Sequence, residues 1–282
     1  MVKVAAIQMS MSENQSVNIQ KALDFVLQAS QNGANIVLLP ELFSSLYFCK
    51  DMDEKYFSLA HPLKNNPLIK QFSDIAQELQ IVLLVSYFEK ADDEYYNSLV
   101  VINSDGTVMD NYRKTHIPDG PGYEEKFYFK SGNTGFKVYE TNFGKIGVGI
   151  CWDQWFCETA RVLTLKGAEI IFYPTAIGSE PEIHLDSKEH WQRVQMGHAA
   201  TNTVPVVVAN RIGKEIGKSC EITFYGSSFM TDYTGEKIAE ASRDIEEIIY
   251  TQYNLEENAK NREYWGLLRD RKPSTYTQLI QE

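Results

Sequence analysis

Cysteine is scarce in this chain, and no two cysteines form a CxxC pair. The 282 residues include four cysteines, at positions 49, 151, 157 and 220. Such scattered cysteines exclude the disulfide framework of small secreted domains, and the missing CxxC pair argues against a structural zinc site. We therefore expect free thiols in a reduced, cytoplasmic setting, with no metal and no cofactor.

Long apolar runs and an excess of basic residues are absent as well. No stretch reaches the roughly 18 apolar residues of a membrane span, and the N-terminus MVKVAAIQMS lacks the apolar core of a signal peptide. The 27 basic residues face 38 acidic ones, which gives a net charge of −11. Because phosphate binding needs clustered Lys and Arg, the charge disfavours nucleic acid as a partner and is compatible with a cationic substrate.

Strand and helix patterns alternate along the chain. VKVAAIQM and NIVLLP have the pattern of strands, and a helical pattern follows each, the first capped by Ser16 and the second opened by Pro67. A hairpin over residues 97–114 and helices near 158–166 and 187–202 come later. With no repeat and no linker-like break, this order predicts one layered α/β domain over residues 1–282.

Three chemically useful residues, Glu41, Lys114 and Cys151, each closely follow a predicted strand. In layered α/β folds, side chains at strand ends leave the sheet into a cleft. A thiol with its ordinary pKa of about 8.5 is a poor nucleophile, but a carboxylate can accept its proton and an ammonium can hold the negative oxygen that forms on attack. Taken singly, each residue is more often a packing residue or a surface charge, and spacing alone does not join them.

The segments LLPELF, YRKTHIP and GICWDQWF resemble, in this order, the signature segments of the nitrilase superfamily of carbon–nitrogen hydrolases. The resemblance covers essentially the whole chain and implies a four-layer α-β-β-α sandwich that forms homo-oligomers, with the tail over 254–282 extended and a candidate interface. It also implies a catalytic triad of Glu41, Lys114 and Cys151 with a second glutamate. Glu125 matches this glutamate; Glu124 competes, but the register of EKFYF favours Glu125.

Further segments, among them HIPDGPGYEEKFYF, AIGSEP and WGLLRDRKP, resemble the branch of the superfamily that hydrolyses N-carbamoylputrescine in polyamine synthesis from agmatine. This resemblance implies a small cationic ureido substrate and a thioester intermediate on the cysteine. Relatives of the branch carry proline where this chain has Cys157, at the predicted start of a helix.

A substrate with a ureido group at one end and an ammonium at the other needs a pocket with apolar walls around its alkyl chain, here called the sleeve. It also needs an acidic residue at the far end of the pocket to pair with the ammonium. Aromatic residues near the strand ends predict the sleeve, namely Tyr47, Tyr123 and Trp152. By motif match, Glu180 in IGSEP is the acid that meets the amine, and the alternatives are Glu182, Asp186 and Asp119. Aromatic faces also attract cations, by about 0.5–2 kcal/mol.

Two rival activities within the superfamily remain at this point, a ureidopropionate-type hydrolase and an ω-amidase. Both act on anionic substrates and should have an Arg or Lys at the distal end of the pocket. A non-catalytic scaffold of the same fold is a third alternative, which the retention of all three triad residues disfavours. The histidines are interpreted as hydrogen-bonding residues, with His116 orienting the loop after Lys114.

Overall fold

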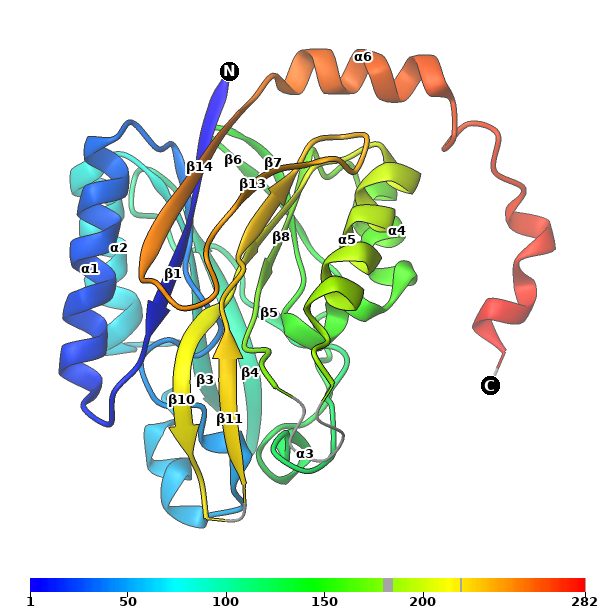
Figure 1. Ribbon diagram of the computed structural model, residues 1–282. Coiled ribbons are helices and arrows are strands. Elements are labelled where there is room, and N and C mark those ends of the chain that lie inside the picture. The colour runs from blue at the N-terminus through cyan, green and yellow to red at the C-terminus, as the bar shows by residue number, and fades with distance from the viewer. Residues whose placement is uncertain (180–184, 219, 282) are drawn as a thin grey trace.

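Two β-sheets lie face to face at the centre of the computed structural model, which describes residues 1–179, 185–218 and 220–281 (Figure 1). The first sheet has the order β11-β10-β1-β2-β3-β4-β5, with β14 also paired to β1. Its strands are β1 Val2–Ser10, β2 Ile36–Leu38, β3 Val82–Ala91, β4 Glu94–Ile102, β5 Tyr112–Arg113, β10 Arg211–Ile216, β11 Glu221–Tyr225 and β14 Glu247–Tyr253. The second sheet has the order β13-β12-β9-β8-β7-β6, with β6 Val138–Thr141, β7 Gly144–Val148, β8 Ile170–Pro174, β9 Val206–Ala209, β12 Phe229–Thr231 and β13 Lys237–Glu240.

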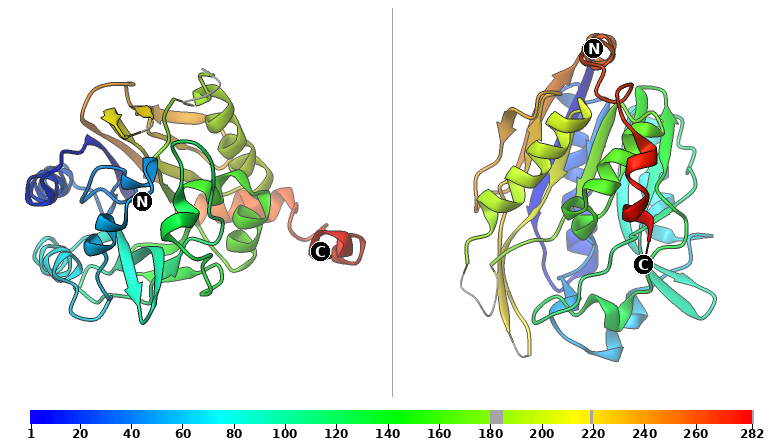
Figure 2. Two further views of the ribbon diagram at one scale, coloured as in Figure 1. Left: turned by 90° about the horizontal axis from the view of Figure 1, so that it is seen from below. Right: turned by 90° about the vertical axis from the view of Figure 1, so that its right-hand side faces the viewer.

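Helices cover the outer face of each sheet, so the expected four-layer α-β-β-α sandwich is confirmed. Helices α1 (Gln15–Gln31) and α2 (Pro67–Leu79) pack on the first sheet, and α4 (Cys157–Leu165) and α5 (Lys188–Asn202) pack on the second. Figure 2 shows the two helical layers on opposite sides of the sheets. The short helix α3 (Glu125–Tyr128) lies in the long loop that precedes β6.

Successive side chains of β1 point to opposite faces of the sheet, and both faces are apolar and buried. Val4 and Ala6 point into the core between the sheets, whereas Ala5 and Ile7 pack under α1 and α2. Full burial of an aliphatic side chain such as Val or Ile contributes about 1.5–3 kcal/mol. A central strand that is apolar on both faces therefore fixes the order of the layers.

One local prediction is wrong and others are confirmed. The cap of α1 is Asn14 and not Ser16, because the Asn14 side chain accepts from the backbone N–H groups of Ser16 and Val17. The predicted hairpin over 97–114 is confirmed: β4 pairs with β5 at Ser98 and Leu99, and Ile102 bridges to Val108 near the turn. On its other edge β4 pairs along its whole length with β3, which was not predicted. Pro67 is the first residue of α2, as predicted.

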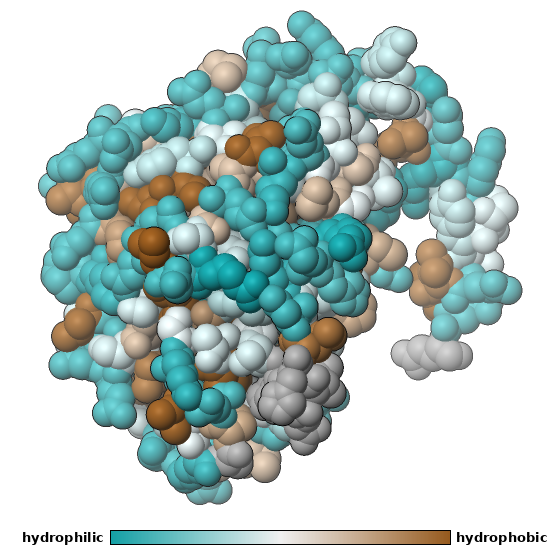
Figure 3. All heavy atoms as spheres, viewed as in Figure 1, coloured by the Kyte–Doolittle hydropathy of each residue, from teal (hydrophilic) through white to brown (hydrophobic). Residues whose placement is uncertain are grey.

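The C-terminal segment leaves the body of the molecule. Helix α6 (Leu255–Trp265) has no buried residue, and two 3-10 turns, Pro273–Thr275 and Thr277–Ile280, follow it, so the predicted extended tail contains helical turns. Helix α6 still contacts the body, since Leu255 packs against the core and Arg262 donates to Ala168 O at 3.0 Å, and the space-filling view shows the segment beyond α6 standing off from the rest of the chain (Figure 3). None of the helices in the described part of the chain is long and apolar enough to cross a membrane.

Candidate active site

Lys114 lies between two buried carboxylates. Its ammonium Nζ is 2.9 Å from Oε1 of Glu41 and 2.8 and 2.6 Å from the two oxygens of Glu125. All three side chains have no exposed surface. The structure thus brings together residues from the end of β2, the end of β5 and the start of α3, and it is Glu125, not its neighbour Glu124, that contacts Lys114.

The backbone around Lys114 is held on both sides. Its N–H donates to the carbonyl of Asn97 on β4, and its carbonyl accepts from the N–H of Gly132, each at 2.8 Å. A Cβ at Gly132 would lie 2.1 Å from the carbonyl oxygen of Arg113, so the loop can approach the strand this closely only with glycine. This contact ties the long loop over 115–135 to the lysine.

Glu41 has one occupied and one free carboxylate oxygen. Oε1 accepts from Lys114 and from the side-chain amide of Asn97, at 2.7 Å in the second case. Oε2 is buried and has no hydrogen-bond partner among the described residues. A buried carboxylate oxygen without a partner is costly, so this oxygen is available for a proton brought by another group.

Cys151 sits at the first position of a tight 3-10 turn, Cys151–Trp155, directly beyond β7. Its φ of +42° is left-handed, a conformation that costs a non-glycine residue about 1–3 kcal/mol. Asp153 holds the turn: one carboxylate oxygen accepts from Ile150 N at 2.9 Å and from the Tyr112 hydroxyl at 2.7 Å. The other accepts from His116 N at 3.0 Å and lies 2.7 Å from His116 Nδ1, which links the Cys151 turn to the segment after Lys114.

The charges of this cluster shift its pKa values. Burial, reinforced by the negative charge of Glu41, raises the pKa of the Cys151 thiol well above its ordinary value, although Lys114 acts to lower it. Burial also raises the pKa of Glu125 to about 7, again against the effect of Lys114. For Lys114 burial disfavours the ammonium, but Glu125 and Glu41 outweigh it and hold its pKa well above the ordinary value. At neutral pH the resting cysteine is therefore a thiol beside a charged lysine.

A cavity of about 330 Å³ opens at the cysteine. Glu125 and Cys151 reach it, and so do two of the three predicted sleeve residues, Tyr123 and Trp152. Three of the remaining described lining residues are polar, namely Asp119, Ser187 and His190. The others are apolar or small: Pro118, Gly120, Pro121, Trp155, Ala176, Ile177 and Leu185. No lysine or arginine occurs among the described lining residues.

Two predicted substrate-binding residues lie elsewhere. Tyr47 is fully buried behind the site: its hydroxyl donates to Oε1 of Glu125 at 2.7 Å, and its ring packs 5.8 Å from that of Tyr123. Tyr47 therefore supports the second glutamate and does not line the described cavity. Glu180, the predicted partner of the amine, lies outside the described residues, as does Glu182.

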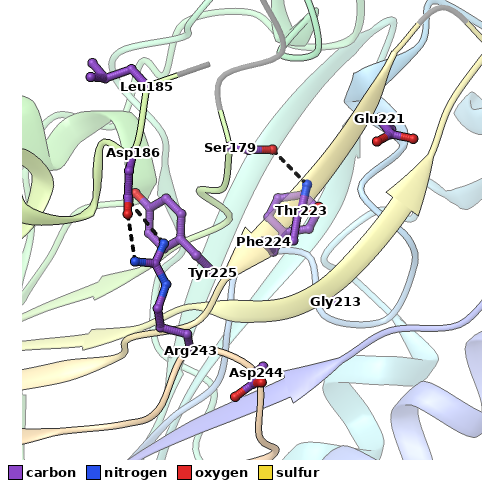
Figure 4. Close-up of a pocket in the computed structure, with 10 residues that line it drawn as sticks. All are labelled: Ser179, Leu185, Asp186, Gly213, Glu221, Thr223, Phe224, Tyr225, Arg243 and Asp244. Carbon is purple, nitrogen blue, oxygen red and sulfur yellow. Dashed lines mark hydrogen bonds and ion pairs between the residues drawn. The ribbon is translucent and has the colours of Figure 1, made fainter. Parts of the chain in front are cut away.

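A second cavity, of about 540 Å³, lies beyond Leu185, which borders both (Figure 4). In it the Arg243 guanidinium pairs with both oxygens of Asp186, at 2.8 and 3.1 Å. Asp186, an alternative acid for the amine, thus already has a cationic partner. None of Glu41, Lys114, Cys151 and Glu125 lines this larger cavity, so its size does not mark it as the reactive centre.

Sequence reasoning missed the residues that hold this site from behind. Asn97, Asp153 and Arg211 are buried polar residues that contact the backbone or side chains of the reactive group. For Asp153 a signal existed, because it lies within the GICWD segment. Asn97 and Arg211 stand in ordinary strand sequence, and only the packing of distant strands reveals their contacts.

Known proteins resemble this chain in sequence and in fold. A family model described as carbon-nitrogen hydrolase matches residues 3–262, and the chain belongs to this family, whose members hydrolyse non-peptide carbon–nitrogen bonds. It is 50% identical to the N-carbamoylputrescine amidase of Arabidopsis thaliana over 99% of this chain and 95% of the relative. It is also 50% identical to a citrullinase of Francisella tularensis, over 100% of this chain and 99% of the relative. The crystal structure of a carbon–nitrogen hydrolase from Helicobacter pylori, 38% identical, superposes with a TM-score of 0.93 over 100% of this chain and 99% of that one.

Proposed function

We propose that this chain hydrolyses N-carbamoylputrescine to putrescine, carbon dioxide and ammonia, as a step of polyamine synthesis from agmatine. The observation that carries the proposal is the lining of the cavity at Cys151, which is mainly aromatic and apolar and contains no lysine or arginine among its described residues. Such a lining suits a ureido group, an alkyl chain and an ammonium. The identity to the plant amidase supports the same substrate.

The chemistry begins at the thiol. Glu41, through its free oxygen, accepts the proton of Cys151 while the sulfur attacks the ureido carbon, and Lys114 with the N–H of Trp152 holds the oxygen that becomes negative. Glu41 then returns the proton to the departing nitrogen, because an amide anion is a very poor leaving group. A carbamoyl thioester remains on Cys151.

Water completes the turnover. Glu41 removes a proton from a water molecule, the resulting hydroxide adds to the thioester carbon, and the C–S bond breaks as the sulfur regains a proton. The carbamate released decomposes to carbon dioxide and the second amine. In sum, one ureido group and one water give one carbon dioxide and two amines, one of them ammonia. Glu125 holds Lys114 throughout, through the contacts at 2.6 and 2.8 Å.

Citrulline is the second candidate substrate, because an equally similar relative is named a citrullinase. It has the same ureido group and an ammonium, but it adds a carboxylate next to the ammonium. A buried carboxylate needs a cationic partner, and the described lining residues provide none. The same argument disfavours ureidopropionate and the ω-amides.

A substrate panel tests this proposal. Ammonia release is measured with carbamoylputrescine, citrulline, ureidopropionate, glutaramate and a simple nitrile. We expect the highest kcat/KM for carbamoylputrescine, with putrescine as a product. A higher kcat/KM for citrulline would make citrulline the assigned substrate and would leave the proposed ureido chemistry unchanged. Hydrolysis of glutaramate alone would contradict the proposal.

Homo-oligomer formation belongs to the same proposal. The arm that follows β14 has no buried residue in α6 and exposes Tyr264 and Trp265 at 85% and 59% of their surfaces. Large aromatic residues exposed on a projecting helix are typical of a contact surface. Replacing both with serine should lower the sedimentation coefficient of the native protein if the arm binds a second copy, and an unchanged coefficient would place the interface elsewhere.

A further inference from the structure

A second cluster of buried charges lies directly behind the carboxylates of the site. Arg211 and Glu215 stand four residues apart on β10, so their side chains share one face of the strand. The guanidinium of Arg211 is 2.9 Å from Oε1 of Glu215, and the Lys50 ammonium is 3.3 Å from Oε2. These three side chains are at most 4% exposed and none of them lines the cavity.

Arg211 holds the turn that carries Glu41. Its Nη2 donates to the backbone carbonyl of Glu41 at 2.7 Å and to that of Leu42 at 3.1 Å, and its Nη1 donates to Ser45 O at 3.3 Å. Leu42 has a φ of +48°, an unfavourable conformation for a residue with a side chain. The two terminal nitrogens of the guanidinium bond different acceptors at once: Nη2 bonds the two successive carbonyls, and Nη1 bonds Ser45 O and the Glu215 carboxylate. The single ammonium of a lysine cannot reach both sets in the same geometry.

Glu215 and Lys50 hold the backbone of Tyr47. Oε2 of Glu215 accepts from Tyr47 N at 2.7 Å, and Nζ of Lys50 donates to Tyr47 O at 3.0 Å. The Tyr47 hydroxyl in turn donates to Glu125. The cluster therefore reaches both carboxylates that flank Lys114. It bonds the backbone of Glu41 directly, and it reaches Glu125 through Tyr47.

Stability alone gives little reason for such a cluster. Apolar side chains of similar volume usually stabilise a core as well as a buried ion pair does, since the pair must first lose its hydration. What charges add is directional bonding to particular carbonyl and N–H groups, and here those groups belong to Glu41, Leu42, Ser45 and Tyr47.

We infer that Arg211 and Glu215 are positioning residues for the reaction: they fix the direction in which the Glu41 carboxylate and the Tyr47 hydroxyl point. This inference rests on the proposed role of Glu41 as the proton acceptor. A small displacement of a catalytic group is costly, since a misplacement of about 1 Å can slow a reaction about a hundredfold.

The variants Arg211→Lys and Glu215→Asp test the inference, because both keep the charge and shorten or narrow the contacts. Val26→Ala is the matched control: Val26 lies on α1, and its side chain is buried in the core cluster between that helix and the first sheet, which shares no residue with the cavity lining. Its truncation lowers stability without touching the Arg211 cluster. Active sites are counted by alkylation of Cys151, and kcat per counted site and KM are measured on the best substrate of the panel. We expect Arg211→Lys to lower kcat about ten- to a hundredfold with KM within about threefold, and Val26→Ala to lower only the melting temperature.

Two outcomes overturn the inference. Wild-type kcat per counted site in Arg211→Lys would leave the cluster a purely structural role, and an equal change of kcat in Val26→Ala would show that lost stability alone slows turnover. If Arg211→Lys does not fold, the milder Glu215→Asp decides by the same criteria. Glu41→Gln separates this inference from the proposed function. If Glu41→Gln retains turnover, the proposed role of Glu41 is wrong. If Glu41→Gln loses turnover while Arg211→Lys and Glu215→Asp keep the wild-type kcat, only the inference about the positioning residues is rejected.

Discussion

The ammonium of Lys114 lies 2.9 Å from Oε1 of Glu41, and neither side chain has any surface exposed to solvent. Glu125 shares the same ammonium, so one buried positive charge stands between two carboxylates. Removing one partner of a buried ion pair costs about 3–5 kcal/mol, because the other charge is left uncompensated. Substitutions that keep the shape and change only the charge are therefore the most informative ones at this site.

Cys151→Ser should leave a folded protein with turnover reduced by several orders of magnitude, because a serine hydroxyl is much less acidic than a thiol. Mass spectrometry of the wild-type enzyme quenched with substrate should show a carbamoyl adduct on Cys151. An adduct on the exposed Cys157 instead, or full activity of the serine variant, would contradict the assignment of the nucleophile.

Glu41→Gln should abolish turnover and at the same time lower the pKa of Cys151. Glu41 raises the pKa of this thiol because a negative charge disfavours the nearby thiolate, and glutamine removes that charge. The rate of iodoacetamide alkylation at Cys151, followed from pH 6 upward, should therefore rise at lower pH in the variant than in the wild type. An unchanged or higher midpoint would mean that Glu41 does not act on the thiol.

Glu125→Gln should collapse turnover while Cys151 still reacts with small alkylating agents, and it should change the pH dependence of stability. Burial raises the pKa of Glu125 from 4.5 to about 7, so the folded state binds this proton more tightly than the unfolded chain does. The stabilising contribution is complete below pH 4.5 and is lost as the pH rises through 7. The difference in melting temperature between the wild type and the glutamine variant should thus decrease as the pH is raised from 5 to 8. A difference that stays constant over this range would contradict the raised pKa of Glu125.

Individual strands and helices were predictable from local sequence patterns and the four layers from the family resemblance, whereas the contacts behind the site were not predictable. Apolar alternation and helical spacing are local patterns, so they placed β1, α2 and α5 correctly. The hydrogen bond from Asn97 to Glu41 and that from Arg211 to the carbonyl of Glu41 join residues 56 and 170 positions apart, and no local pattern encodes such pairs. Tyr47 was assigned to the substrate sleeve for a related reason: its sequence position gives no sign that the ring turns inward to Glu125.

Cys157→Pro should be tolerated and slightly stabilising. Cys157 is the first residue of α4, and the preceding Phe156 has φ −96° and ψ 114°, close to the extended conformation that a residue before proline adopts. Proline at a compatible position stabilises by about 0.4–1 kcal/mol, because it restricts the unfolded chain. Urea unfolding should show a higher midpoint with an unchanged slope. A markedly lower midpoint would indicate that the contact of the thiol with Glu158, at 3.3 Å, or the backbone N–H of Cys157 contributes to stability.

Two acids compete for the distal ammonium of the proposed substrate, Glu180 by motif match and Asp119 by its position on the cavity wall. The Asp119 side chain is 49% exposed and already lies 4.0 Å from the Lys126 ammonium, so its contribution to binding the amine should stay near 0–1 kcal/mol, about fivefold at most.

A partly buried acid paired with an ammonium contributes about 1.5–3 kcal/mol, or roughly ten- to a hundredfold in affinity. If Glu180 is that acid, Glu180→Gln should raise KM for carbamoylputrescine by this larger factor, and Asp119→Asn by the smaller one. N-Pentylurea, which replaces the ammonium with a methyl group at equal length, should be hydrolysed equally well by both variants and the wild type. A large effect confined to Asp119→Asn would assign the amine to Asp119, and equal losses on both substrates would show that Glu180 has a structural role.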